Sequence, residues 1–385
     1  MRCDVTRPDL SRNNNGSPCE KIAEKASTGT SILEGTMDQR LVTIGTTVLT
    51  ALTALSLTTA AQADSVSDFY AGKTLTMVVP SGSGGTFHIY AQIAARHLGR
   101  HIPGNPEIIT QNRPGAGGVK AASYMANAAP KDGTVIAEIN PGSIIVPLLR
   151  KVKFDPRKFN WLGTLTVRTY TIASWHDSPV DTLDKLKNTK LVVGASGVGS
   201  LNFQMPTFLN YAAGTKFDVI RGYKGGGAIN LAMERKEVKG RFNFYSGYTG
   251  AKPDWIRDKK VQFIATMGPS RPEVAAYPRM QDHIKGDLNT KMYNLLAVGL
   301  DIGQSFYIPA GVPADRVAAL RTAFAKMLKD PVMLADAETR RLPINSRGAV
   351  HVEKVIDAAF NVDPAVPAAL SKILGIGKKK AKKKK

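Results

Sequence analysis

Short apolar runs that lead into glycine loops and then into amphipathic segments recur along this chain. Residues 75–79 are rich in β-branched residues, which is typical of a buried strand, and Pro80 follows them directly. Residues 81–85 are all serine or glycine, so the backbone can turn sharply there. From Thr86 onwards the apolar positions follow a helical period. The pattern therefore predicts a strand, a glycine loop and a helix, in that order.

The same order of elements is predicted three more times. Strands are predicted at residues 107–111, 191–195 and 218–220, and each is followed by a glycine-rich loop and a helix. Repeated units of this kind are typical of an open α/β sheet that holds a ligand at its strand ends. The four units fall into two groups along the chain, which predicts two similar lobes.

The remaining pattern adds further strands and helices to both lobes. Strands are predicted at residues 134–139, 161–165, 169–175, 241–245, 262–267 and 305–308. The last of these is expected to return the chain to the first lobe. Helices are predicted at residues 181–187, from Pro313, and from Asp330-Pro331 to about Arg340. Pro313 and Asp315 are assigned to the first and third helical positions.

The amino-terminal part of the chain has the features of an export signal. A threonine-rich apolar run at residues 41–61 leads into Ala61-Gln62-Ala63, a small-x-small cleavage pattern, so we expect cleavage after Ala63. A transmembrane anchor is the alternative, but the threonines dilute the run and no charged flank follows it. Residues 1–36 are polar and patternless, and we expect Met37 to be the true start.

Both cysteines of the chain, Cys3 and Cys19, precede this predicted signal. The mature chain would then contain no cysteine, which excludes disulfides, thiol catalysis, cysteine metal sites and a lipid-anchoring cysteine. The sequence therefore predicts a soluble protein exported to a periplasm.

The formal net charge of +21 is unevenly distributed along the chain. Seven lysines lie in the tail at residues 378–385, so +21 less 7 leaves +14 for the rest. Such a tail is typically disordered and solvated, with contact to anionic lipid as the alternative. No aromatic–basic interleaving or nucleic-acid motif accompanies the charge, so we expect no nucleic-acid partner.

Candidate catalytic and metal-binding patterns are incomplete. Residues 82–87 and 197–202 lack the last glycine of the dinucleotide-binding pattern, and residues 72–74 resemble only the end of a phosphate loop. Ser200 lacks the glycine pattern of a nucleophile elbow, and nothing fixes the geometry of His88, His176 or Asp177 around it. His97 and His101 are four residues apart, but no glutamate follows and Gly99 interrupts the helix. We therefore expect no catalytic residue, no cofactor and no metal, and not an enzyme.

The glycine loops favour anion binding instead. A Gly/Ser loop that opens onto a helix start leaves backbone N–H groups and a partial positive charge directed outward. For any single loop, a plain tight turn in the sheet is the alternative.

Six motifs, in order and in spacing, resemble the periplasmic solute receptors of tripartite tricarboxylate transporters, also called Bug-type receptors. They are Val78-Val-Pro80 with Gly84-Gly85, Gln111-Asn-Arg-Pro-Gly-Ala-Gly-Gly118, Ala129-Pro-Lys-Asp-Gly-Thr134, Gly197-Val-Gly-Ser200, Gly222-Tyr-Lys-Gly225 and Pro309-Ala-Gly-Val-Pro313. The resemblance implies an α/β, two-lobed periplasmic binding protein of the type II-like class, with a ligand cleft between the lobes. It also implies a small organic anion as ligand, a carboxylate, which is handed to membrane permease subunits.

Mapped onto this chain, the resemblance places the ligand on two facing sets of loops. To these we add Asn140, at another predicted strand end, and His88. The expected ligand-binding residues are Ser81, Gly82, Ser83, Gly84, Gly85, Thr86, His88, Asn140, Ser196, Gly197, Gly199, Ser200, Asn202, Tyr223, Lys224 and Gly225.

Two departures from the family pattern affect the ligand. Ser81, Gly82 and Ser83 stand where an aromatic residue and prolines are usual, and His88 stands where an aspartate is usual. Our hypothesis is that His88 lies at the cleft and takes up a ligand group that an aspartate would repel. In the alternative, His88 points away and only packs.

These expectations define the organisation of the chain and two functional alternatives. We expect an extension at residues 1–36, a signal peptide at 37–63, a first lobe at 64–165 plus 300–377, a second lobe at 166–299, and the tail at 378–385. The expected function is capture of a carboxylate by a monomeric receptor. The alternatives are a periplasmic ligand sensor that reports to a membrane signalling partner and, less well supported, an α/β enzyme with glycine-rich phosphate loops.

Overall fold

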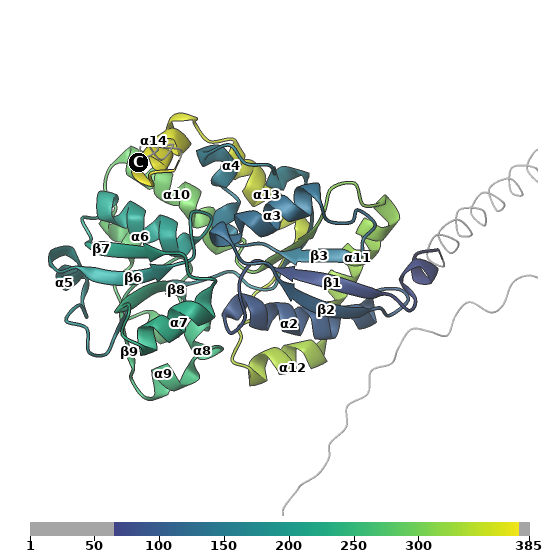
Figure 1. The fold of residues 1–385 in the computed structure, drawn as a ribbon, viewed down its shortest axis with the longest axis horizontal. Coiled ribbons are helices and arrows are strands. Elements are labelled where there is room, and N and C mark those ends of the chain that lie inside the picture. Colours follow the sequence, from purple (N-terminus) through teal and green to yellow (C-terminus); the bar gives the residue numbers. More distant parts are fainter. Residues whose placement is uncertain (1–64, 377–385) are drawn as a thin grey trace, which may run out of the picture. The chain divides into compact units, whose positions relative to one another are not determined.

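Two β-sheets form the centre of the structure, a computed structural model that describes residues 65–376 (Figure 1). The predicted extension, signal peptide and lysine tail lie outside these residues. Helices flank each sheet, which confirms the predicted α/β class with two lobes. No helix in the described range is long and apolar enough to cross a membrane.

The first sheet has the strand order β11-β4-β10-β3-β1-β2. Strand β1 pairs in parallel with β2 and β3, whereas β10 runs antiparallel to both β3 and β4. The strands are β1 (Thr74–Val79), β2 (Glu107–Asn112), β3 (Val135–Glu138), β4 (Asn160–Thr164), β10 (Ser305–Ile308) and β11 (Arg347–Gly348).

The second sheet repeats this plan, in the order β7-β6-β8-β5-β9. Strand β6 pairs in parallel with β7 and β8, and β5 runs antiparallel between β8 and β9. In both sheets the antiparallel strand enters from the other lobe. The strands are β5 (Tyr170–Trp175), β6 (Leu191–Ala195), β7 (Phe217–Arg221), β8 (Gly240–Phe244) and β9 (Val261–Met267).

Alternating side chains of each sheet pack against helices on both of its faces. In β1, Leu75, Met77 and Val79 join one hydrophobic cluster while Val78 joins another, as the two-residue period of a strand requires. The first cluster is covered by α2 (Thr86–Leu98), α11 (Ala314–Met327) and α12 (Pro331–Thr339), the second by α3 (Val119–Asn127), α4 (Val146–Leu149) and α13 (Ala349–Phe360).

The second sheet is covered in the same way, with one helical layer on each side (Figure 1). On one side lie α6 (Leu201–Ala212), α10 (Asp287–Asp301) and α14 (Ala365–Ile373), with α5 (Leu183–Asn188) at the sheet end. On the other lie α7 (Gly226–Glu234), α8 (Ser246–Thr249) and α9 (Pro253–Arg257).

The predicted strands are all present, but the helix assignments need corrections. Pro313 is the residue before α11 and not its first helical residue, because its backbone is extended and its carbonyl accepts the first helical hydrogen bond from Val317 N–H at 3.0 Å. Helix α7 begins at Gly226, two residues earlier than expected. Helices α4, α8, α9, α10, α13 and α14 were not predicted. The residues of α14 lie in the segment 300–377 that we expect in the first lobe, whereas their apolar side chains join the hydrophobic cluster of the second sheet.

Two chain segments that run between the sheets are hydrogen-bonded to each other. Leu165 N–H donates to the Gln304 carbonyl at 3.0 Å, and Gln304 N–H donates to the Thr166 carbonyl at 3.0 Å. Gly303, with a φ of +44°, lets the segments approach this closely, because a Cβ there would lie 1.8 Å from the Thr166 oxygen. The lobes are therefore joined by a paired connection.

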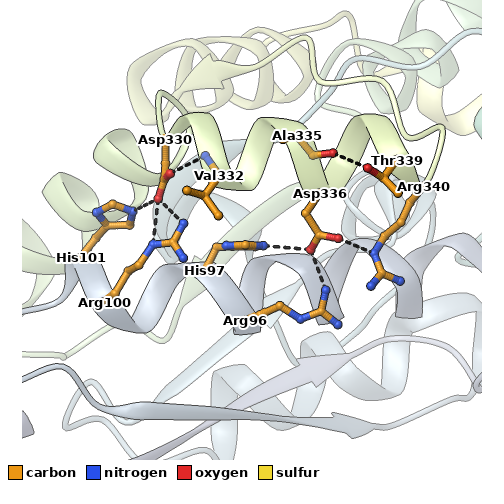
Figure 2. A network of polar contacts seen from close by, with 10 residues as sticks. All are labelled: Arg96, His97, Arg100, His101, Asp330, Val332, Ala335, Asp336, Thr339 and Arg340. Carbon is orange, nitrogen blue, oxygen red and sulfur yellow. Dashed lines mark hydrogen bonds and ion pairs between the residues drawn. The ribbon is translucent and has the colours of Figure 1, made fainter.

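A cluster of ion pairs ties the end of α2 to α12, as Figure 2 shows. Asp336 accepts from Arg96 at 2.6 Å, from His97 at 2.9 Å and from Arg340 at 2.7 Å. Burial alone would raise the pKa of Asp336, but these three donors together hold that pKa well below its usual range. The carboxylate is therefore a structural anchor between two helices of the first lobe.

The two histidines that had resembled a metal site belong to this cluster, each facing a different aspartate. His101 donates to Asp330 at 2.7 Å, while His97 donates to Asp336 (Figure 2). Helix α2 ends at Leu98, and Gly99–His101 continues it as a 3₁₀ turn.

We predict that Asp336→Asn lowers the free energy of unfolding at pH 7 by roughly 1.5–3 kcal/mol, because charged hydrogen bonds are lost. Since the folded pKa of Asp336 is depressed, its contribution is present above about pH 4 and declines as the pH falls below that value. Denaturant unfolding at pH 7 and pH 3 measures both effects. Asp287→Asn is the control, because Asp287 forms an exposed pair with Lys291 on α10. Equal losses for the two variants at pH 7 would contradict the prediction.

Candidate ligand-binding site

A small cavity lies between the two sheets, at the ends of the parallel strands. The volume of this cavity is about 40 Å³. In this arrangement of the lobes it therefore admits only a small molecule. Both lobes line it, with the residues Pro80, Ser81, Gly85, Thr86, Phe87, Gly115, Gly117, Asn140, Tyr170, Ser196, Ser200, Asn202, Tyr223, Lys224, Gly225, Gly226, Arg241, Phe242, Asn243, Phe244 and Gly247.

Four helices begin at or beside this cavity: α2, α3, α6 and α7. The residues before them, Gly85, Gly118, Ser200 and Gly225, make no side-chain capping hydrogen bond, and no first turn contains an acidic residue. By contrast, Asp330 caps α12. The first N–H groups of a helix have no partner within the helix, and they carry a partial positive charge. The cavity is therefore built to receive an anion.

The lobes touch through backbone atoms at the rim of the cavity. Gly82 N–H donates to the Lys224 carbonyl at 2.7 Å, and Gly199 N–H donates to the Ala116 carbonyl at 3.1 Å. A Cβ at Gly227 would lie 2.5 Å from the Ser83 oxygen of the other lobe. Glycine is required at this position by the close approach of the lobes.

Asn202 holds the loop between β6 and α6 in shape. Its Oδ1 accepts from Ser196 N–H at 3.1 Å and from the Ser200 hydroxyl at 2.6 Å. The amide oxygen thus joins two residues that both line the cavity. Asn202 consequently orients the serines of this loop.

Strand β8 brings a cation into the cavity wall. Arg241 is 3% exposed, and its Nη1 donates to Asn230 Oδ1 and, at 3.4 Å, to the Gly226 carbonyl. Burial lowers the pKa of this guanidinium. Its Nε has no partner among the described residues, and neither does Nδ2 of Asn243, two residues further along the strand. These two donors are available to a ligand.

Two aromatic rings close the cavity on the side of the connection between the lobes. Phe87 of α2 and Phe244 of β8 meet edge to face, with centroids 5.9 Å apart. The buried guanidinium of Arg168 lies behind them, 4.5 Å from the Phe87 centroid and 4.0 Å from that of Phe244. This cation–π contact joins residues of both lobes and of the connection.

Most of the residues expected to bind the ligand line the cavity. They come from both lobes and comprise Ser81, Gly85, Thr86, Asn140, Ser196, Ser200, Asn202, Tyr223, Lys224 and Gly225. Those outside the lining are Gly82, Ser83, Gly84, His88, Gly197 and Gly199. The N–H groups of Gly82 and Gly199 donate to backbone carbonyls of the opposite lobe.

His88 is not among the residues that line this cavity, and the hypothesis that it takes up a ligand group stays a prediction. The residue is in the first turn of α2, and its Nδ1 is buried without a partner in the described structure. Burial lowers the pKa of His88. The packing alternative fits this environment better.

Arg241 and Asn243 were missed from the sequence, as were Phe87, Tyr170 and the glycines at 115 and 117. A signal for the first two existed, because they alternate with phenylalanines in a predicted buried strand. Polar residues at every second position of such a strand point to one face. Both polar residues line the cavity, and so do the phenylalanines between and after them, because the cavity lies at the end of the strand.

Comparison with known families gives one match that covers most of the chain. The model of the tripartite tricarboxylate transporter family receptor matches residues 90–361. A Cupriavidus necator protein, the UPF0065 protein in the gbd 5' region, is 26% identical over 278 residues, which are 70% of this chain and 79% of that protein. A UPF0065 protein of Bordetella bronchiseptica is 26% identical over 72% of this chain and 78% of its own length.

Solved structures share the fold. The periplasmic binding protein BugD is 21% identical, with a TM-score of 0.65 over 80% of this chain and 99% of that one. MatC from Rhodopseudomonas palustris, solved with bound malate, is 20% identical, with a TM-score of 0.62 over 79% and 99%. Another protein of R. palustris, solved with adipate, is 19% identical, with a TM-score of 0.61 over 79% and 98%.

We predict that His88 is neutral in the folded protein at about pH 6.5, where a free imidazole is half protonated. Because its folded pKa is lowered, stability is full above about pH 6.5 and declines as the pH falls below that value. Thermal unfolding of the wild type and of His88→Gln between pH 5 and pH 7.5 tests this. The variant should lose less stability on acidification, and equal slopes would show that His88 is not responsible.

Proposed function

The chain belongs to the tripartite tricarboxylate transporter receptor family, and from this premise we propose that it captures a small carboxylate in the cavity between its lobes. Members of this family are periplasmic solute-binding receptors, which places the protein in the periplasm as part of a transport system. The bound solute would pass to the membrane permease subunits. Since one chain supplies the whole cavity, we propose that the receptor works as a monomer.

The observation that carries the proposal is the charge of the cavity wall. Helix starts without caps and the buried Arg241 supply positive potential, and none of the described residues that line the cavity is an aspartate or a glutamate. Relatives of the same fold were solved with malate and adipate. A carboxylate fits both the potential and the hydrogen-bond donors.

The energy available from such donors is sufficient for a receptor. Each hydrogen bond to a charged group is worth roughly 1.5–3 kcal/mol. Four or five to one carboxylate, less the cost of ordering, reach the approximately −8 kcal/mol of micromolar binding. No covalent step is needed, and we propose that the chain has no catalytic activity of its own.

Export is proposed to proceed through a cleaved signal peptide. The apolar run at residues 41–61 and the Ala61-Gln62-Ala63 pattern precede the described structure. The described structure begins immediately afterwards, at residue 65.

A thermal-shift screen of small carboxylates tests the proposed function. A ligand that binds the closed form raises the melting temperature by an amount that grows with the logarithm of its concentration relative to Kd. We expect short dicarboxylates to stabilise the protein more than adipate, because the cavity is small. Stabilisation by nucleotides but by no carboxylate would refute the proposal.

The same screen on Gly227→Ala serves as an internal check. The new Cβ would meet Ser83 across the cleft and hold the lobes apart, so the ligand-induced shift should fall by more than half. Gly348→Ala is the matched control, since a Cβ there has no neighbour within 4 Å and the shift should not change.

Amino-terminal sequencing of the protein isolated from the periplasm tests the processing. We expect the mature chain to begin at Asp64. A mature chain that retained residues 41–61 would contradict cleavage after Ala63.

A further inference from the structure

We propose that Glu138 and Arg168 form a charge latch in the connection between the lobes: they pair as ions when the lobes are apart, and closure over a ligand separates them. In the closed form Arg168 lies on the rings of Phe87 and Phe244, and Glu138 holds a proton. Ligand capture is thereby coupled to the uptake of a proton. This inference rests on the proposed function and adds a regulation of lobe closure to it.

Glu138 is the last residue of β3, and its carboxyl group lies in the apolar core of the first lobe. The residue is 0% exposed, and neither carboxyl oxygen has a hydrogen-bond donor within residues 65–376. Its side chain points to the same side of the sheet as Ile136, two residues earlier, and as Phe306, the residue opposite in β10. Both belong to the cluster that α2 covers. An ionised carboxylate there would be costly, so the group is neutral in this arrangement of the lobes.

Arg168 is a buried cation without an acceptor. The residue is 2% exposed, and none of its guanidinium nitrogens has a hydrogen-bond partner in the described part of the chain. The guanidinium group lies instead on the rings of Phe87 and Phe244, which come from different lobes. These two contacts exist together only while the rings meet. Separation of the lobes therefore leaves Arg168 in need of another partner.

Glu138 is the acid within electrostatic reach of Arg168. Burial raises the pKa of Glu138 well above its usual range, and the positive charge of Arg168 opposes this rise. Gln304, on the other connecting segment, is 0% exposed, and both of its amide atoms lack a partner within the described residues. Buried polar groups are normally hydrogen-bonded, so this arrangement of the lobes leaves the connection unsatisfied.

The other titratable groups near Glu138 in the described structure already have partners. Tyr90 of α2 lies within electrostatic reach of Glu138, and burial raises the pKa of its hydroxyl. That hydroxyl donates to the Pro343 carbonyl at 2.9 Å. Arg271 lies near Tyr90, but it is paired with Glu273 at 2.8 Å. The proton taken up on closure is therefore assigned to Glu138.

Titration calorimetry with malate, in two buffers of different ionisation enthalpy, counts the protons taken up on binding. Because the pKa of Glu138 is higher in the closed form than in an ion pair, closure takes up a proton and affinity falls as the pH rises. Between pH 6.5 and pH 8, where malate is a dianion, we expect the uptake by the wild type to reach at least about 0.3 proton per ligand. A smaller uptake throughout this range would overturn the latch.

Glu138→Gln keeps the shape of the neutral acid but cannot form the ion pair. We expect it to take up no proton and to bind malate several-fold more tightly than the wild type at pH 8, because the open form loses its ion pair. Glu107→Gln is the matched control, since Glu107 is exposed at the start of β2, and it should behave as the wild type does. Unchanged or weaker binding by Glu138→Gln, or unchanged proton uptake, would refute the role of Glu138.

Two variants of Arg168 separate the latch from a purely structural role. Arg168→Met leaves Glu138 without a cation in either form, so proton uptake should vanish although the carboxyl group is intact. Arg168→Lys restores a cation and should restore the uptake. Uptake by the methionine variant, or none by the lysine variant, would refute the pairing.

Infrared spectroscopy of the ligand-free protein tests the latch even if malate does not bind. At pH 7 the wild type should show the band of a protonated carboxylic acid, and Glu138→Gln should lack it. Gly227→Ala, in which a Cβ holds the lobes apart, should show less of this band. Absence of the band from the wild type, or an equal band in Gly227→Ala, would overturn the latch. If the band behaves as expected but no carboxylate binds, only the proposed function fails.

Discussion

Positive electrostatic potential from four helix starts, directed at one small cavity, is the constraint on which the rest of this structure depends. The partial charges at the starts of α2, α3, α6 and α7 repel one another when the lobes meet. The chain adds no acidic residue or capping side chain there to relieve this. An anion between the lobes would relieve it, and closure and binding are then two parts of one equilibrium.

The requirement for close approach explains the glycines better than loop flexibility does. Gly227 is in a helical first turn, where alanine would be locally acceptable, yet the Ser83 oxygen of the other lobe leaves no room for a Cβ. Gly85 is also closely approached, because a Cβ there would lie 3.2 Å from Gly226 N of the other lobe. Glycine here allows the backbones of the two lobes to approach each other closely at the cavity.

The connection between the lobes is itself coupled to the cavity wall. Arg168 N–H donates to the Leu300 carbonyl at 2.9 Å, which ties the two connecting segments together. Its guanidinium contacts Phe87 from one lobe and Phe244 from the other. A rotation of one lobe relative to the other would disturb these contacts. The free energy of lobe closure therefore depends on the connection between the lobes as well as on the rim of the cavity.

The sequence alone determined the repeated strand–loop–helix units, because strand and helix periods and glycine loops are properties of short windows. It also predicted most of the loops that line the cavity, since a glycine loop before a helix is a local pattern. Only the tertiary structure decided which loops meet, for Ser83 and Gly227 are far apart in sequence and adjacent in space. It likewise decided that His88 lies outside the cavity and that Arg241 faces it. His97 and His101 find their aspartates on a helix more than two hundred residues away. The physical reason is that local periodicity determines the type of an element, whereas the direction and partners of a polar side chain depend on how distant elements pack.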